Sequence, residues 1–267
     1  MNLEALFDPL FRVPFAAGLL VSLVLPLVGA LLRLRDEWLA ALGLAHLAGA
    51  GALVGLAAGI PTVLGTTIAA TLGALIKNRG GLHGNSVDAV MILVGWSVTL
   101  LVAANTTLGS AMGHALVEGQ LFFAAPAHLI AAFVLALLIA ALLPRLMPAL
   151  IRARLFPGFG VPDRRAGRHR DLVFDLLVAL SVALGTAVVG LMAAFALIFL
   201  PAWLAFAVAR SWRQTLLIVV AVGVIGYIAA FVAALLLDQP FGPVLVAVLT
   251  GVAVGRVLYR PERGSLG

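Results

Sequence analysis

The sequence has no cysteine, and charged residues make up only 10% of its 267 residues. Without cysteine the chain forms no disulfide bond and no thiolate metal site. It contains no GxxxxGK[ST] stretch, so we expect it not to bind ATP by itself. It also has no HExxH motif and no nucleophile paired with a base, which argues against a membrane-embedded enzyme.

The sequence is instead rich in apolar residues. Hydrophobic residues make up 63% of the chain and the mean hydropathy is +1.18, far above the values typical of soluble domains. We therefore predict an all-α, polytopic membrane protein, with residues 1–267 forming a single transmembrane domain. The amino terminus lacks a charged segment and a small-residue cleavage site, so the apolar stretch 15–32 is expected to be a retained span.

Eight or nine membrane spans are predicted, because a span needs roughly 20 apolar residues. The stretch 171–209 is too long for one span, so we divide it at a turn near Gly190. Residues 1–13 resemble a short interfacial helix, and a frayed terminus is the alternative. The predicted spans cover residues 14–32, 38–59, 62–76 (a short one), 87–105, 126–147, 171–187, 190–209, 214–236 and 241–258.

Basic residues follow every odd-numbered span and are absent from the even-numbered turns. Cytoplasmic loops retain Lys and Arg, so this pattern puts the carboxyl terminus and the loop 148–170 on the cytoplasmic side of the membrane and the start of the first span outside. Arg12 is the one exception. The net charge of +6 thus reflects membrane boundaries and does not indicate a nucleic-acid partner. The basic residues that set the pattern are Arg33, Arg35, Lys77, Arg79, those from Arg145 to Arg170, Arg210, Arg213, Arg256, Arg260 and Arg263.

One titratable residue, His46, lies near the middle of the uncharged span 38–59. An ionisable side chain at that depth indicates either a transport pathway or a hydrogen bond to another helix, and both interpretations remain open. On a helix its face is shared by small residues and one leucine, so we expect His46 to point into the bundle. These neighbours are Leu42, Gly43, Gly49 and Ala50. Gly51, Gly55 and Gly59 recur every fourth residue, a spacing that favours close helix packing.

Other candidate metal ligands are sparse. Asp88 and Asp175 start predicted spans, where a helix N-terminus would also favour a carboxylate. Asp238 lies at an external turn. His114 and Glu118 are four residues apart in an outer loop, which is a weak signal without a third ligand.

The loop 152–170 combines Arg and His residues with Phe156, Pro157, Phe159 and Pro162. Its positive charge favours anchoring to anionic lipid. The apolar cluster within the basic run also predicts a protein partner, because anchoring alone would not need Pro and Phe in a defined turn.

Three stretches together resemble the ABC-3 family, the membrane permeases of binding-protein-dependent ABC importers for zinc, manganese or iron. LAHLAGAG at 44–51 is similar to the family pattern D-x-L-[SA]-H-x-x-x-x-G, with His46 and Gly51 in register. The segment 188–210 resembles the V-G-x-L-L…P-A-A-T-A-R block through Gly190, Pro201, Ala202 and Arg210. LDQPFGPVLV at 237–246 is similar to the closing D-x-P-x-G-P turn, with Asp238, Pro240, Gly242 and Pro243.

The resemblance implies a BtuC-like helical bundle that pairs with a second copy, two cytoplasmic ABC ATPase subunits and an extracytoplasmic metal-binding protein. Zn²⁺ or Mn²⁺ would be the substrate, with no cofactor bound by this chain and no catalytic residue. Residues 152–162 would meet the ATPase through Arg152, Arg154, Pro157, Gly160 and Pro162. His46 is the main pathway candidate, with Asp238, Asp88 and His114 as weaker ones, while Gly51, Gly190, Pro201 and Gly242 are motif residues.

The chain departs from the family at several positions. Leu42 stands where the family has an acidic residue one turn before the histidine, so His46 lacks that carboxylate partner. His114 replaces an aspartate, Leu204 a threonine, and Arg152 a common acidic residue. The leading hypothesis is an importer permease for a divalent transition metal. The alternative is a self-sufficient secondary transporter or exporter, which would usually carry paired carboxylates or broken helices at mid-membrane.

Overall fold

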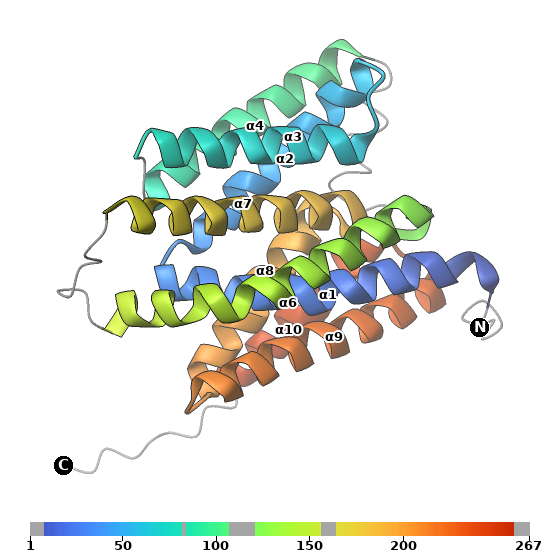
Figure 1. The fold of residues 1–267 in the computed structure, drawn as a ribbon. Coiled ribbons are helices and arrows are strands. Elements are labelled where there is room, and N and C mark those ends of the chain that lie inside the picture. The colour runs from blue at the N-terminus through green and yellow to red at the C-terminus, as the bar shows by residue number, and fades with distance from the viewer. Residues whose placement is uncertain (1–7, 82–83, 107–120, 156–163, 259–267) are drawn as a thin grey trace.

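The computed structural model describes residues 8–81, 84–106, 121–155 and 164–258, and all regular elements within these ranges are helices (Figure 1). The predicted all-α class is therefore confirmed. The helices are η2 (Pro9–Phe11), α1 (Arg12–Arg35), α2 (Trp38–Ala57), α3 (Thr62–Arg79), α4 (Asn85–Asn105), η3 (Leu121–Phe123), α6 (Pro126–Leu155), α7 (Arg164–Val189), α8 (Leu191–Val208), α9 (Trp212–Leu237) and α10 (Phe241–Leu258).

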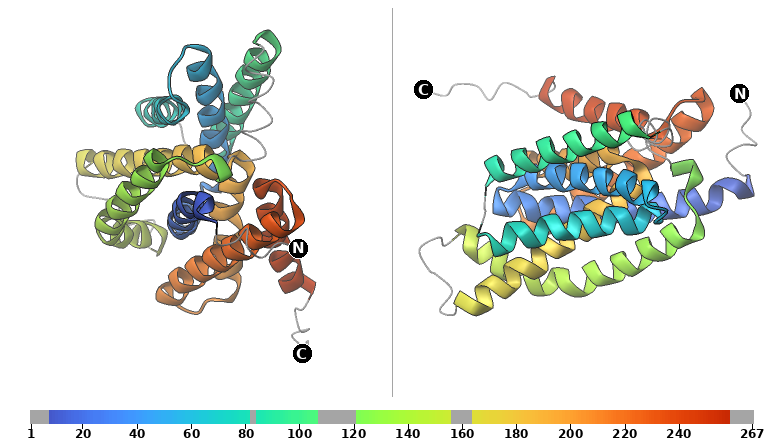
Figure 2. Two further views of the ribbon diagram at one scale, coloured as in Figure 1. Left: turned by 90° about the vertical axis from the view of Figure 1, so that its right-hand side faces the viewer. Right: turned by 90° about the horizontal axis from the view of Figure 1, so that it is seen from above.

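Helix α1 lies at the centre of the bundle and packs against α6, α7, α8 and α9. Helices α2, α3 and α4 form a group on one side, and α9 and α10 lie on the opposite side, as the end-on view in Figure 2 shows. Helix α7 connects the group α2–α4 to the central helix, because it packs against α1 as well as α2 and α3.

Seven of the described helices are long and apolar enough to cross a membrane, and Phe241–Arg256 forms a shorter apolar helix. Helix α3 is not among the seven, in keeping with the short third span expected from the sequence. The outer surface agrees with a lipid environment, because large apolar side chains such as Leu93, Ile130 and Leu217 are about two-thirds exposed. The chain is thus a multi-pass membrane protein with roughly the predicted number of spans.

The loop predicted over 148–170 is shorter in the structure. Helix α6 continues to Leu155 and α7 begins at Arg164, so residues outside the described ranges fill only 156–163. At about 1.5 Å per residue, the 30 residues of α6 extend about 45 Å, well beyond a ~30 Å hydrocarbon core. Hydropathy marks where a span leaves the hydrocarbon, whereas good helix formers such as Arg, Ala and Leu allow the helix to continue into water.

Glycines allow neighbouring helices to approach closely. A Cβ added to Gly51 would overlap the Ala69 side chain and the Gly65 carbonyl, so α2 and α3 meet backbone to backbone there. Gly55 also faces Gly65, which supports the packing role predicted for both glycines. Gly59 departs from this expectation: α2 ends at Ala57, and Gly59 lies in the following turn with φ +74° and open space around it. Its role is the left-handed backbone, which favours glycine.

The remaining motif residues lie at turns or helix starts, except Pro201, which is inside a helix. Gly190 caps α8 with φ +93°, at the predicted break between α7 and α8. Pro201 is buried within α8, and Gly242 is buried in the first turn of α10. Asp238 ends α9 in a left-handed conformation with φ +51°, and its N–H donates to the Ala234 carbonyl.

The interfacial helix predicted over 1–13 lies largely outside the described residues. From Asp8 onward the chain forms the short helix η2, and the Asp8 carboxylate accepts a hydrogen bond of 2.8 Å from the Leu10 N–H. Helix α1 then begins at Arg12, earlier than the predicted span, so Arg12 occupies its first turn.

Candidate functional site

His46 lies near the middle of α2 and only 5% of it is exposed. The predicted inward orientation is therefore correct. Its Nδ1 lies 2.9 Å from the carbonyl oxygen of Leu42, one turn earlier on the same helix. A carbonyl oxygen can only accept a hydrogen bond, so Nδ1 must carry the proton. In the neutral imidazole the other ring nitrogen, Nε2, then keeps its lone pair, which is the arrangement common for metal-binding histidines.

Helix α4 covers His46. A Cβ added to Gly95 would lie 2.8 Å from the His46 Cβ, so only a glycine at this position lets the two helices approach so closely. The next residue, Trp96, presents its ring edge-on to the imidazole, with 6.0 Å between the ring centroids. Trp96 is itself 44% exposed, so its indole separates His46 from the outer surface of α4.

The small residues on the His46 face contact two different helices. An added Cβ on Gly43 would meet the Asp88 carbonyl and the Met91 side chain of α4, and one on Gly49 would meet Leu191 of α8. His46 is therefore at the junction of α2 and α4, close to α8. Helix α4 thus forms the cover over His46 on this face, where α2 presents mainly small residues.

The other predicted metal candidates do not gather around His46. No group of three or more His, Asp or Glu side chains suited to a metal occurs among the described residues. Asp238 is an exposed helix cap between α9 and α10, on the side of the bundle opposite α2. His114 and Glu118 lie outside the described residues.

Four buried charged residues and the partly buried Arg35 form a second polar centre, which we name the charge cluster: Arg35, Glu37, Lys77, Asp88 and Asp175. Lys77 Nζ lies 2.8 Å from Asp88 Oδ1 and 3.4 Å from Glu37 Oε2. Arg35 lies 3.2 Å from both Glu37 Oε1 and Asp175 Oδ1, and its guanidinium stacks 4.7 Å above the Phe174 ring. With every group ionised, two cations face three carboxylates.

The charge cluster ties together five helices. Arg35 ends α1, Glu37 precedes α2, Lys77 is in the last turn of α3, Asp88 is in the first turn of α4, and Asp175 belongs to α7. The Asn78 amide adds a bond of 3.2 Å from α3 to Asp175 Oδ2. Buried charges are tolerated only when paired and hydrogen-bonded, so these contacts fix the five helices relative to one another.

The cluster changes the interpretation of two predicted residues. Asp175 does not start a helix, because α7 begins eleven residues earlier at Arg164, so the predicted helix N-terminal role is wrong. Asp88 is in the first turn of α4 as expected, but it is fully buried and bound to Lys77. Its second oxygen has no hydrogen-bond partner among the described residues. Both aspartates are thus structural ion-pair partners.

Sequence reasoning missed Arg35, Glu37 and Lys77 as members of this site. Arg35 and Lys77 were interpreted only as topology markers. A usable signal was present, since acidic and basic residues both occur at the ends of spans one to four that share one side of the membrane.

The predicted ATPase-docking residues are only partly described. Arg152 and Arg154 are exposed at the end of α6. Pro157, Gly160 and Pro162 lie outside the described residues.

The described residues thus form a multi-pass bundle of apolar helices with a buried imidazole near the middle of one span and a cluster of paired charges. A family model for the ABC 3 transport family matches residues 7–260. The chain therefore belongs to this family and is a permease of the ABC transporter class. Comparison with curated protein sequences gave no match.

Two solved structures share the fold. PsaBC from Streptococcus pneumoniae, solved in complex with a Fab, superposes with a TM-score of 0.80 at 14% identity and covers 100% of this chain and 99% of its own. A transporter assigned to the metal-chelate type of ABC transporters, in an inward-facing conformation, gives a TM-score of 0.71 at 16% identity and covers 98% and 92%. At these identities the similarity establishes the fold.

Proposed function

We propose that this chain is the permease subunit of a binding-protein-dependent ABC importer that moves a divalent transition metal, zinc or manganese, across a bacterial inner membrane. A binding protein outside would deliver the ion, and a separate cytoplasmic ATPase would drive alternating access. Two copies of the chain would form the permease, with their carboxyl termini in the cytoplasm. Family membership and the fold shared with PsaBC support this assignment.

The observation that carries the proposal is the free Nε2 of His46. Its Nδ1–H is held by the Leu42 carbonyl, so the imidazole is oriented and its lone pair is available to a metal. Neutral imidazole is a common ligand for zinc and related metals. His46 also lies near the middle of the span 38–59, which contains no other titratable side chain.

A transport pathway needs weak and exchangeable binding. One imidazole from each of two copies would supply transient coordination, whereas a structural zinc site uses four ligands. Trp96 would act as the movable cover, since its ring lies edge-on to the imidazole and is half exposed. Displacement of α4 would then open the imidazole to the passing ion.

ATPase contact would occur at the cytoplasmic end of α6 and the residues that follow. Arg152 and Arg154 are exposed there and α6 extends past the hydrocarbon core, so both side chains are available to an acidic partner surface. Pro157, Gly160 and Pro162 would complete this contact, as the family pattern implies.

A secondary transporter has less support. Such a protein would usually carry carboxylates free to bind an ion near mid-membrane, whereas the buried carboxylates of the described residues, Glu37, Asp88 and Asp175, are paired with Arg35 and Lys77.

The test is metal uptake by cells that carry His46→Ala together with the partner subunits. We expect uptake to fall at least about tenfold, as expected for loss of a metal ligand, while the amount of purified complex stays unchanged. His169→Ala is the matched control, because His169 is an exposed histidine on α7. Unchanged uptake by His46→Ala would remove the role assigned to this residue. Uptake without any co-purifying ATPase would overturn the importer assignment as a whole.

A further inference from the structure

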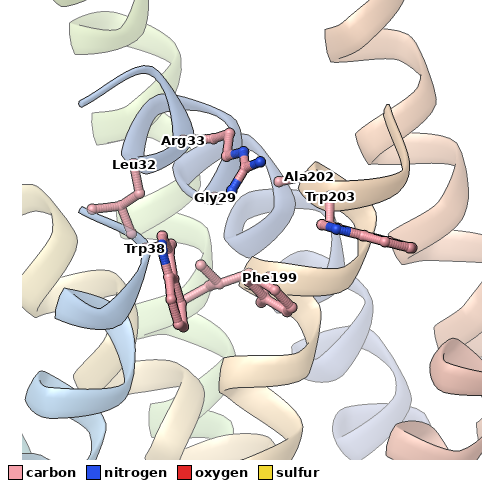
Figure 3. Close-up of a pocket in the computed structure, with 8 residues that line it drawn as sticks. Gly29, Leu32, Arg33, Trp38, Phe199, Ala202 and Trp203 are labelled. Carbon is pink, nitrogen blue, oxygen red and sulfur yellow. The ribbon is translucent and has the colours of Figure 1, made fainter. Parts of the chain in front are cut away.

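A shallow groove between α1, α2 and α8 combines one arginine with three aromatic side chains (Figure 3). Its lining residues are Gly29, Leu32, Arg33, Trp38, Ile198, Phe199, Ala202 and Trp203. Figure 3 shows the Arg33 guanidinium beside Gly29 and Ala202, with the Trp38 and Phe199 rings below it and the Trp203 ring extending to the right. The groove is separate from His46 and from the charge cluster, because it shares no lining residue with either.

Arg33 is an uncompensated cation. Among the described residues its guanidinium makes no ion pair and no side-chain hydrogen bond, whereas Arg35, two residues later, contacts Glu37, Asp171 and Asp175. Arg35 thus contacts three carboxylates, whereas Arg33 points to the opposite side of α1; the neighbouring Asp36 is exposed in the turn that follows α1 and pairs with neither arginine within the described chain. An arginine presents a planar fork of donors that matches a phosphate group well.

The aromatic side chains supply both apolar surface and further donors. The Trp38 and Phe199 rings are in contact, with centroids 5.5 Å apart, and Phe195 stacks on Phe199 at 5.5 Å. Within the described chain, the indole N–H groups of Trp38 and Trp203 make no hydrogen bond, unlike that of Trp212, which donates to Met147. Tryptophan favours a site that is apolar on one side and polar on the other.

The groove lies at the depth of the lipid headgroups. Arg33 is two residues from the end of α1, and Trp38 is the first residue of α2, so both flank the turn at 36–37. Trp203 and Phe199 belong to α8, which ends at Val208 shortly before Arg210. Trp and Arg at the ends of spans are the residues that anchor a protein at the membrane interface.

We propose that this groove binds an anionic phospholipid of the cytoplasmic leaflet. Arg33 pairs with the phosphate, the two indole N–H groups donate to headgroup or ester oxygens, and the acyl chain lies along the partly exposed rings of Phe199 and Trp203. Charge complementarity favours this occupant, because the groove holds one free cation and no carboxylate. A second copy of this chain would leave the guanidinium without a counter-charge unless it supplied an acidic residue.

The test uses the full chain with Trp96→Phe and Trp212→Phe, which leaves Trp38 and Trp203 as its only tryptophans. The protein is reconstituted in zwitterionic nanodiscs, and brominated phosphatidylglycerol is titrated in while tryptophan quenching is measured. We expect saturable quenching at a low mole fraction. Arg33→Gln should raise the midpoint about fivefold, the value expected for loss of one lipid-facing charge, and Arg33→Lys should restore most of the binding.

Arg79→Gln is the matched control, because Arg79 is exposed in the last turn of α3, also has no partner within the described chain and lies on the same membrane side. Its midpoint should stay unchanged, and inorganic phosphate should not displace the lipid. Equal midpoints for Arg33→Gln and the unsubstituted background, or equal losses in the two Gln variants, would overturn the proposal. Absence of quenching at any mole fraction would also overturn it, since that result means that protein covers the groove.

Discussion

Lys77 and Asp88 form an ion pair of 2.8 Å in which the Asp88 side chain has no exposed surface. This contact joins the end of α3 to the start of α4, and Glu37 extends it to the turn between α1 and α2. Because α4 also carries Trp96, the charge cluster determines where the cover of His46 lies. Helix α4 thus connects the charge cluster with His46, the candidate functional residue.

The first prediction concerns this ion pair. Lys77→Met leaves Asp88 as a buried carboxylate without a cation, which costs about 3–5 kcal/mol of stability when a buried pair loses one partner. Thermal unfolding of the purified chain in detergent should show the loss. The double variant Lys77→Met/Asp88→Leu should lose less stability than Lys77→Met alone, because no carboxylate then remains at position 88.

The control for that comparison is Arg79→Met, which removes an exposed cation from the same turn of α3 and should change stability by no more than about 0.5 kcal/mol. Equal losses in Lys77→Met and the double variant would mean that Lys77 and Asp88 are not coupled.

The second prediction concerns the contact of α2 with α3. Gly51→Ala would force its methyl group into Ala69 and the Gly65 carbonyl, so we expect a loss of about 1–3 kcal/mol. Gly251→Ala in α10 is the control, because an added Cβ there meets open space and alanine favours a helix by about 1 kcal/mol. Detergent thermal stability of the isolated chain measures both. Similar stability of the two variants would contradict the close approach of α2 and α3.

The third prediction concerns access to His46. Diethylpyrocarbonate should modify His46 slowly, because the side chain is buried beneath α4. Trp96→Ala should increase the rate several-fold, whereas Trp96→Phe should leave it nearly unchanged, since a ring remains over the imidazole. Mass spectrometry of the peptides gives the rate, with the exposed His169 as the internal reference. A rate at His46 that does not respond to Trp96→Ala would exclude Trp96 as its cover.

The fourth prediction depends on the proposed function. Leu42→Asp restores the acidic residue of the family one turn before His46, and a carboxylate suits manganese better than imidazole alone does. We expect the purified complex to retain more metal, with manganese gaining relative to zinc, as measured by elemental analysis. Leu42→Asn is the uncharged control. If Leu42→Asp and Leu42→Asn retain the same metal, position 42 does not contribute to the site.

The sequence was sufficient for the helical class, most span boundaries and the buried position of His46. Its predictions failed at the end of α6 and at Asp175, where a helix continues beyond the apolar segment. Hydropathy measures partition into hydrocarbon and carries no information about how far a helix extends into water. The repeat of Gly51, Gly55 and Gly59 predicted close helix packing at all three glycines. The structure shows it at Gly51 and Gly55, whereas Gly59 lies in a turn because α2 ends at Ala57.

The sequence by itself determined features that depend on neighbouring residues or on sums along the chain. These are the lengths of the apolar segments, the alternation of basic and uncharged loops, the spacing of small residues and the family motifs. Only the tertiary structure decided which charges meet. Arg35 and Arg33 are two residues apart in the chain, yet one lies among three carboxylates and the other faces an apolar groove with none. That difference arises because successive residues of a helix point in different directions, and the partners on each side come from helices far away in the sequence.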